Sequence, residues 1–161
     1  MAVEALLNSS LQVEPDEQLR LVIEHVCGQL QERDWALLRG ILQPKMYEKG
    51  SELLSIGQHC RYLWYLASGA VRVYEMHDGT ERTSYFFTDG SLFIDYYSVA
   101  TKRPSELCFV AEENSKTLTM DYADLLSLYE QSQPLERIGR KMAERQFVTE
   151  YEKRRALLKL S

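Results

Sequence analysis

The 161-residue sequence lacks any apolar run that approaches the roughly 20 residues needed for a membrane-spanning helix. Its first residues, Met1–Glu4, carry no basic stretch ahead of an apolar segment, so no signal peptide is evident. Only three cysteines are present, and Cys27, Cys60 and Cys108 do not form a C-x-x-C spacing. The sequence therefore predicts a cytoplasmic protein with reduced thiols and no membrane contact.

Catalytic motifs are also missing. The sequence contains no G-x-S-x-G, no phosphate-binding P-loop and no G-x-G-x-x-G. Its three histidines, His25, His59 and His77, are scattered and include no H-x-H pair of the kind found in metal-binding cupin barrels. His59 and Cys60 are adjacent, so on a strand they would point to opposite faces. We expect a protein without a catalytic or metal site, and a cupin-like metal enzyme is kept as an alternative.

Charge is unevenly distributed along the chain. The net charge of −5 argues against a general nucleic-acid binder. Residues 134–161 nevertheless contain eight Lys and Arg against four Glu, whereas residues 1–133 contain eleven against twenty acidic residues. This basic segment is compatible with a solvated helix face or with an anionic partner. We expect at most weak, salt-sensitive attachment to DNA.

Apolar residues make up 45% of the chain, which suffices for the core of one domain. Apolar residues spaced by three and four predict a helix from Pro15 and a second, short helix around Trp35. After Pro44 the glycines fall at positions 50, 57, 69, 79 and 90, a spacing typical of turns between short antiparallel strands. Asp78-Gly79 has the composition of a hairpin turn. A sandwich or barrel flanked by helices is predicted.

Two more helices are predicted near the C-terminus. Asp121 is a candidate N-cap for a short helix. From Pro134 a long helix extends to Leu160, with Gly139 as its only glycine. The number of apolar residues on this long helix indicates packing against the sheet or against a second copy of the chain.

Two apolar sets on the long helix suggest how it packs. Leu135, Ile138 and Met142 step by three and four residues, which is the spacing of a helix–helix seam. We predict that this set forms a homodimer interface; a monomer whose helix folds back on its own sheet is the alternative. A second set is assigned to packing against the sheet: Phe147, Tyr151 and Leu158.

One segment interrupts the strand pattern. Residues 90–98 begin like a helix, because Asp95 can cap the backbone amides two or three residues further on. The polar residues 101–106 follow, including Lys102 and Arg103. Amides at a helix N-terminus beside two cations suit a phosphate or another small anion. An ordinary capped turn is the alternative.

Several segments in this order resemble the cyclic-nucleotide-binding domain of the Crp/Fnr transcription regulators, over residues 15–161. The first, Tyr62–Tyr74, contains the family's hydrophobic–x–G–x–hydrophobic–R–V pattern. Asp78–Thr83 and the segment 90–106 follow, and Pro134–Arg140 resembles the entry to the family's dimerisation helix. The resemblance implies an α+β fold: an antiparallel β-roll (a jelly-roll-like double-stranded β-helix) with N-terminal helices and a long C-terminal dimerisation helix.

In that family the segment corresponding to residues 90–106, here called the cassette, binds the cyclic phosphate. Its G-E-[LI] element holds the ribose through the glutamate, and its P-R-x-[AST] element pairs an arginine with the phosphate. On this chain Ile94, Asp95 and Tyr96 occupy the first three places. Pro104 matches, but Ser105 stands where the arginine should be. We therefore expect weak or absent binding of cyclic AMP.

The resemblance also implies partners and a division of the chain. It places a cyclic-nucleotide-binding-like roll at 14–133 and the dimerisation helix at 134–161, and leaves 1–13 unassigned. The partners are a small-molecule ligand (a cyclic nucleotide or another small anion) and a second copy. DNA would bind only through a winged helix–turn–helix, which does not follow Ser161 in this sequence. The implied ligand-binding residues are Phe93, Ile94, Asp95, Tyr96, Arg103, Pro104, Ser105, Glu106 and Thr149.

Two functions follow from this resemblance. In the first, the domain senses a small molecule and transmits its state through the long helix, by favouring one of two helix arrangements. In the second, the domain binds no ligand and serves as a dimerisation scaffold. We predict the first function, a non-catalytic regulatory domain; the missing arginine is the feature that favours the second.

Overall fold

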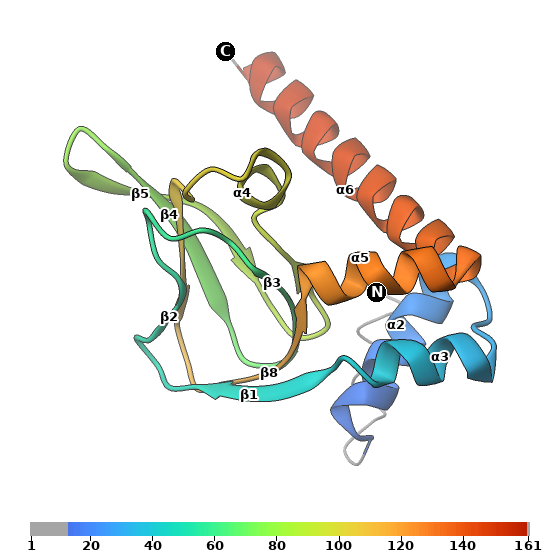
Figure 1. Ribbon diagram of the computed structural model, residues 1–161. Coiled ribbons are helices and arrows are strands. Elements are labelled where there is room, and N and C mark those ends of the chain that lie inside the picture. Colours follow the sequence, from blue (N-terminus) through green and yellow to red (C-terminus); the bar gives the residue numbers. More distant parts are fainter. Residues whose placement is uncertain (1–12, 161) are drawn as a thin grey trace.

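The computed structural model describes residues 13–160; the unassigned segment up to residue 12, and Ser161, lie outside the described residues. It contains a β-roll of two four-stranded sheets, with helices gathered on one side and one long helix extending away from them (Figure 1). The predicted antiparallel β-roll with N-terminal helices and a long C-terminal helix is confirmed. The elements are α2 (Pro15–Cys27), α3 (Glu32–Arg39), β1 (Gln43–Tyr47), β2 (Glu52–Leu54), β3 (Tyr62–Ser68), β4 (Val71–His77), β5 (Thr80–Phe87), β6 (Leu92–Phe93), α4 (Tyr96–Thr101), β7 (Leu107–Ala111), β8 (Ser115–Asp121), α5 (Tyr122–Gln131) and α6 (Gln133–Leu160).

The two sheets have the strand orders β1-β8-β3-β6 and β2-β7-β4-β5, and all their strand pairs are antiparallel. Pro44 lies in β1, which is an edge strand paired to β8. A proline is tolerated there because an edge strand needs backbone hydrogen bonds on one side only. The predicted hairpin turn is present, since Asp78 and Gly79 both have positive φ, at 50° and 76°.

A β-bulge interrupts the β4–β5 hairpin at Ser84. Val73 pairs with Tyr85 and Tyr74 pairs with Thr83, so one extra residue is present on β5. A bulge reverses the alternation of side chains between the two faces of a strand. Tyr85 therefore lies on the face opposite to that of Thr83, together with Phe87, whose ring packs into the interior of the roll.

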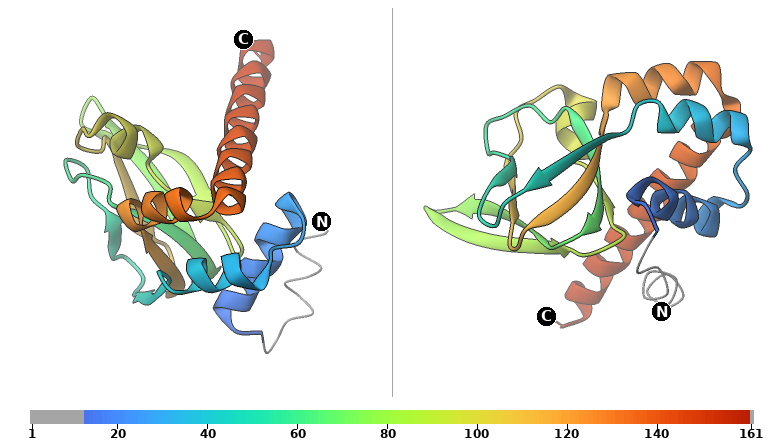
Figure 2. Two further views of the ribbon diagram at one scale, coloured as in Figure 1. Left: turned by 45° about the vertical axis from the view of Figure 1, so that its right-hand side comes forward. Right: turned by 90° about the horizontal axis from the view of Figure 1, so that it is seen from below.

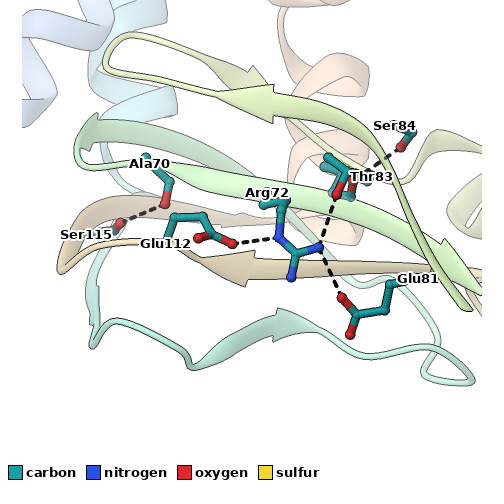
Figure 3. A network of polar contacts seen from close by, with 8 residues as sticks. Ala70, Arg72, Glu81, Thr83, Ser84, Glu112 and Ser115 are labelled. Carbon is teal, nitrogen blue, oxygen red and sulfur yellow. Dashed lines mark hydrogen bonds and ion pairs between the residues drawn. The ribbon is translucent and has the colours of Figure 1, made fainter.

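Arg72 lies on the outer face of this hairpin, where its guanidinium contacts three side chains (Figure 3). Its Nε lies 2.6 Å from Glu112, and its Nη1 lies 3.2 Å from Glu81 and 3.1 Å from the hydroxyl of Thr83. The guanidinium thus joins β4 and β5 to the chain just after β7. Both carboxylates are substantially exposed, so each ion pair adds little stability by itself.

The first turn of α6 is attached to α3 by buried hydrogen bonds of Ser132, here called the Ser132–Asp34 clamp. The hydroxyl of Ser132 donates to Oδ1 of Asp34 in α3, at 2.6 Å, and accepts from the backbone amide of Leu135, at 3.2 Å. Further along, Gly139 lies against the ring of Tyr129 in α5. A Cβ at position 139 would lie 2.3 Å from the Tyr129 hydroxyl oxygen, so the close approach of α5 and α6 requires glycine.

The two apolar sets of α6 face the opposite way from the sequence assignment. Leu135 is 2% exposed within the chain's own core, and Ile138 packs against that core. Met142 is half-buried. Phe147 and Tyr151, which were assigned to packing against the sheet, are 73% and 56% exposed, and Leu158 is similarly exposed. The physical reason is that α6 packs on α2, α3 and α5 only through its first turns and then leaves this helical layer (Figure 2).

Candidate functional site

The cassette connects the two sheets through a short helix. Its chain leaves β6 at Phe93, forms α4 and enters β7 at Leu107. Asp95 is the N-cap of α4, with Oδ1 accepting a hydrogen bond from the amide of Ser98 at 3.2 Å. The predicted cap is confirmed, and the Asp95 carboxylate is directed into the protein, where it is 5% exposed.

The second oxygen of Asp95 is held by Ser105. The Ser105 hydroxyl lies 2.5 Å from Oδ2 of Asp95 and also accepts from the amide of Leu107 at 3.0 Å. The Ser105 hydroxyl has one proton, which it donates to Asp95, and its oxygen accepts the hydrogen of the Leu107 amide. Ser105 is 2% exposed. The two positions that would hold ribose and phosphate in the family are thus hydrogen-bonded to each other.

Ser98 is a central residue that the sequence analysis missed. Its hydroxyl accepts from the amide of Cys60 at 3.0 Å and donates to the carbonyl of Arg103 at 2.6 Å. Beside it, the amide of Ser105 donates to the carbonyl of Gln58 at 2.8 Å. These bonds attach the cassette to the β2–β3 loop. The sequence signalled only the capped amide of Ser98, because Cys60, whose amide donates to the Ser98 hydroxyl, is 38 residues away.

Arg103 is directed away from the buried pair. Its side chain is exposed, and its Nη1 donates to the hydroxyl of Tyr97 at 3.5 Å. The Arg103 carbonyl is bound to Ser98, and the rigid Pro104 follows, so the backbone fixes this outward direction. Lys102, Pro104 and Glu106 are exposed as well. Of the predicted ligand-binding residues, the structure brings Asp95 and Ser105 into contact.

Aromatic side chains fill the roll beneath the cassette. Phe93 stacks on Trp64, with ring centroids 5.7 Å apart, and on Phe87 at 4.4 Å. Phe109 meets Phe93 edge-on at 5.7 Å. Ile94 packs beside this group. The space between the two sheets is thus occupied by rings, with Phe93 as a member of the stack.

The two remaining candidates lie on helices. Tyr96 is exposed and its ring meets that of Tyr122 in α5 edge-on, at 6.5 Å. Burial, and then a hydrogen bond with Tyr96, raises the pKa of Tyr122 to about 12. Thr149 is half-buried on α6 and donates its hydroxyl to the carbonyl of Arg145 at 3.0 Å. A contact of Thr149 with a ligand stays a prediction.

The described residues offer little reactive chemistry. Burial raises the pKa of the Cys60 thiol beside the cassette, which disfavours its reactive thiolate form. Within residues 13–160, no group of three or more His, Cys, Asp or Glu is placed to hold a metal ion. None of the helices in this range is both long and apolar enough to cross a bilayer.

Comparison with known proteins places this geometry in a family. A family model described as "Cyclic nucleotide-binding domain" matches residues 44–132, more than half of the chain. No curated protein matches the sequence. The matched span includes both sheets and the whole cassette, but neither the N-terminal helices nor α6.

Solved structures share the fold at low sequence identity. A catabolite activator protein from Thermus thermophilus is 24% identical with a TM-score of 0.68, covering 85% of this chain and 62% of its own. A cyclic nucleotide-binding domain from Methylobacillus flagellatus is 15% identical with a TM-score of 0.75, covering 86% and 79%. The sensor domain of the transcriptional regulator DNR from Pseudomonas aeruginosa is 15% identical with a TM-score of 0.67, covering 87% and 95%. This chain thus spans less than two thirds of the Thermus protein.

Proposed function

The chain belongs to the cyclic nucleotide-binding domain family, and from this premise we propose that it is a non-catalytic sensor domain of a Crp/Fnr-like transcription regulator. In this proposal a small molecule binds at the cassette and its presence is passed to α6. Support comes from the shared fold of an activator protein and of a regulator's sensor domain. The proposal places the sensing unit at 14–133 and the output helix at 134–161.

The ligand in this proposal is not an anionic cyclic nucleotide, and the Asp95–Ser105 hydrogen bond carries that conclusion. The Asp95 carboxylate, in the place of the family's ribose-holding glutamate, is buried and bonded to Ser105, and this serine brings no positive charge to the place of the phosphate-binding arginine. Arg103 is directed to Tyr97 instead. A hydrogen bond to a charged group contributes about 1.5–3 kcal/mol, so loss of a bidentate pair weakens binding by about two orders of magnitude or more.

Isothermal titration calorimetry tests this proposal directly. The full chain should show no submicromolar binding of cyclic AMP or cyclic GMP, in contrast to a domain with the family's arginine. Arg103→Ala is the matched variant, because it removes the cassette cation that could in principle turn inward. Submicromolar binding of cyclic AMP would contradict the proposal, and Arg103→Ala should then abolish that binding.

A ligand-free dimerisation scaffold is the second candidate, and the packed interior favours it. The cassette satisfies its own buried polar atoms, and the Phe93 stack fills the roll. A ligand that binds the folded state raises the unfolding temperature, and a scaffold has no such ligand. A thermal-shift screen with cyclic nucleotides and uncharged nucleosides separates the two candidates. A rise in the unfolding temperature that is lost in the Asp95→Asn variant supports the sensor.

We also propose a homodimer in the cytoplasm, with DNA bound only by a further domain. All three cysteines, Cys27, Cys60 and Cys108, are unpaired, as is usual in a reducing compartment. The exposed apolar residues of α6 support association with a second copy. The net charge of −5 supports weak contact between this chain itself and DNA.

A further inference from the structure

The later part of α6, residues 147–160 and here called the distal half, makes a contact with the roll. The Nζ of Lys153 lies 3.7 Å from the centroid of the Tyr85 ring on β5. At this distance an ammonium is attracted by the negative face of the ring. Lys153 also lies 3.1 Å from Glu150, one turn earlier on the same helix. The contact therefore joins the distal half to the β4–β5 hairpin.

Tyr85 is presented to α6 by the bulge at Ser84. The bulge places the Tyr85 and Phe87 rings on the inner face of the hairpin, with centroids 4.8 Å apart. Tyr85 is nevertheless 39% exposed, so its ring is accessible to a side chain from outside the roll. A strand with regular alternation from Thr83 would have directed this ring to the other face.

Tyr85 is also the outer end of a continuous row of rings, here called the aromatic row. Phe87 stacks on Phe93 at 4.4 Å with ring planes 10° apart, and Phe93 stacks on Trp64 at 5.7 Å. Phe93 is the last residue of β6, two residues before the cap residue Asp95. The aromatic row thus connects the start of the cassette to the surface that Lys153 contacts.

We propose that Lys153 and Tyr85 form a latch that holds the distal half of α6 against the roll, at the end of the aromatic row. A shift of Phe93 would displace Phe87 and Tyr85, because closely packed rings cannot move independently. The latch would then open, and the distal half would be released from the roll. The inference rests on the proposed function in one respect, namely that α6 is the output of the cassette.

Hydrogen–deuterium exchange of the full chain, without any ligand, tests the latch. Lys153→Ala should raise the exchange rate of amides in residues 147–157 by about threefold to tenfold, as expected for loss of one cation–π contact. Tyr85→Leu should do the same. Because both variants remove one contact, the double variant should exchange no faster than either single variant. Phe87→Leu, which leaves both latch residues in place, should give a smaller increase.

Two matched variants separate the latch from general effects of charge. Lys153→Arg keeps a cation over the ring and should exchange like the wild type. Lys159→Ala removes the same charge from an exposed position and should also leave the rate unchanged. Any one of three results would overturn the latch. These are an unchanged exchange rate in Lys153→Ala, an equal increase of the rate in Lys159→Ala, and additive effects in the double variant. Failure of every ligand in the thermal-shift screen would contradict the sensor function and leave this outcome unaffected.

Discussion

The hydroxyl of Ser105 lies 2.5 Å from Oδ2 of Asp95, and both side chains are almost completely buried. This pair replaces the glutamate and arginine that the resemblance to the Crp/Fnr family implies at the same places. The replacement exchanges a charged, ligand-binding pair for a carboxylate that is satisfied within the chain. A cassette with this pair is complete without a phosphate, because each buried polar group already has its partner.

Removal of the Ser105 hydroxyl should therefore destabilise the fold. Ser105→Ala leaves Oδ2 of Asp95 buried without its donor, which should lower the free energy of unfolding by about 1–3 kcal/mol. Urea denaturation followed by circular dichroism measures this change. Ser127→Ala is the control, since that exposed hydroxyl bonds only within α5, to the carbonyl of Ala123. Equal stability of the two variants would show that the Asp95–Ser105 bond contributes nothing.

Removal of the Tyr65 hydroxyl, unlike removal of the Ser105 hydroxyl, should not lower the free energy of unfolding. Its side chain is fully buried, and its hydroxyl has no hydrogen-bond partner among residues 13–160. Tyr65→Phe should therefore leave the free energy of unfolding unchanged or raise it by up to about 1 kcal/mol. Tyr47→Phe is the matched control and should be destabilising, because the buried Tyr47 hydroxyl accepts from Nε1 of Trp64 at 3.2 Å. Clear destabilisation by Tyr65→Phe would contradict this reading.

The same tyrosine predicts a response to alkaline pH. Burial, and then the nearby charge of Asp89, raises the pKa of Tyr65 to about 12 in the folded protein. An unfolded tyrosine ionises near pH 10, so the unfolded state loses its proton first. Stability from the neutral group is present below about pH 10 and is lost as the pH rises towards 12. Stability curves from pH 9 to 11.5 should fall less steeply for Tyr65→Phe, and parallel curves would refute the assignment.

The sequence predicted those parts of the fold that depend on short-range patterns. The helix periodicity from Pro15, the Asp78-Gly79 turn and the Asp95 cap all involve residues within a few positions of one another. The role of Ser98 could not be predicted in this way, because its partner Cys60 becomes a neighbour only when the β2–β3 loop and the cassette meet. Short-range sequence patterns therefore predict helices, turns and caps, whereas hydrogen-bond partners that are distant in sequence are determined only by the packed fold.

The faces of α6 illustrate the same limit. A helical repeat identifies two apolar sets but does not say which one meets the chain's own core. In the structure Leu135 occupies the core because the Ser132–Asp34 clamp places the first turn of α6 against α3. Both members of the clamp are polar and 98 residues apart, so hydrophobic periodicity gave no sign of it.

Gly139 should be intolerant of substitution even though it lies in a helix. Alanine is normally favoured over glycine in a helix by about 1 kcal/mol. Here its Cβ would lie 2.3 Å from the Tyr129 hydroxyl oxygen, so α5 and α6 would have to separate. Thermal denaturation should show Gly139→Ala to be destabilised, and Gly139→Ala combined with Tyr129→Ala to recover part of the loss by making room. A stabilised single variant would show that the ring moves aside freely.

The last prediction concerns the proposed dimer, whose seam we relocate to the exposed face of α6. Phe147 and Tyr151 are four residues apart and largely exposed, so they are available to a second copy. Sedimentation equilibrium at micromolar protein should give twice the monomer mass of 18.7 kDa. Phe147→Asp should convert this dimer to a folded monomer, because a carboxylate at the seam would be buried without a partner.

Two control variants distinguish the relocated seam from the one predicted by sequence. Leu157→Asp changes another exposed apolar residue of the distal half and should leave the dimer intact. Ile138→Asp should instead destabilise the monomer fold, since Ile138 packs against the chain's own core. A wild-type mass near 18.7 kDa would exclude the dimer. A folded monomer produced by Ile138→Asp, with Phe147→Asp still dimeric, would return the seam to the face that the sequence indicated.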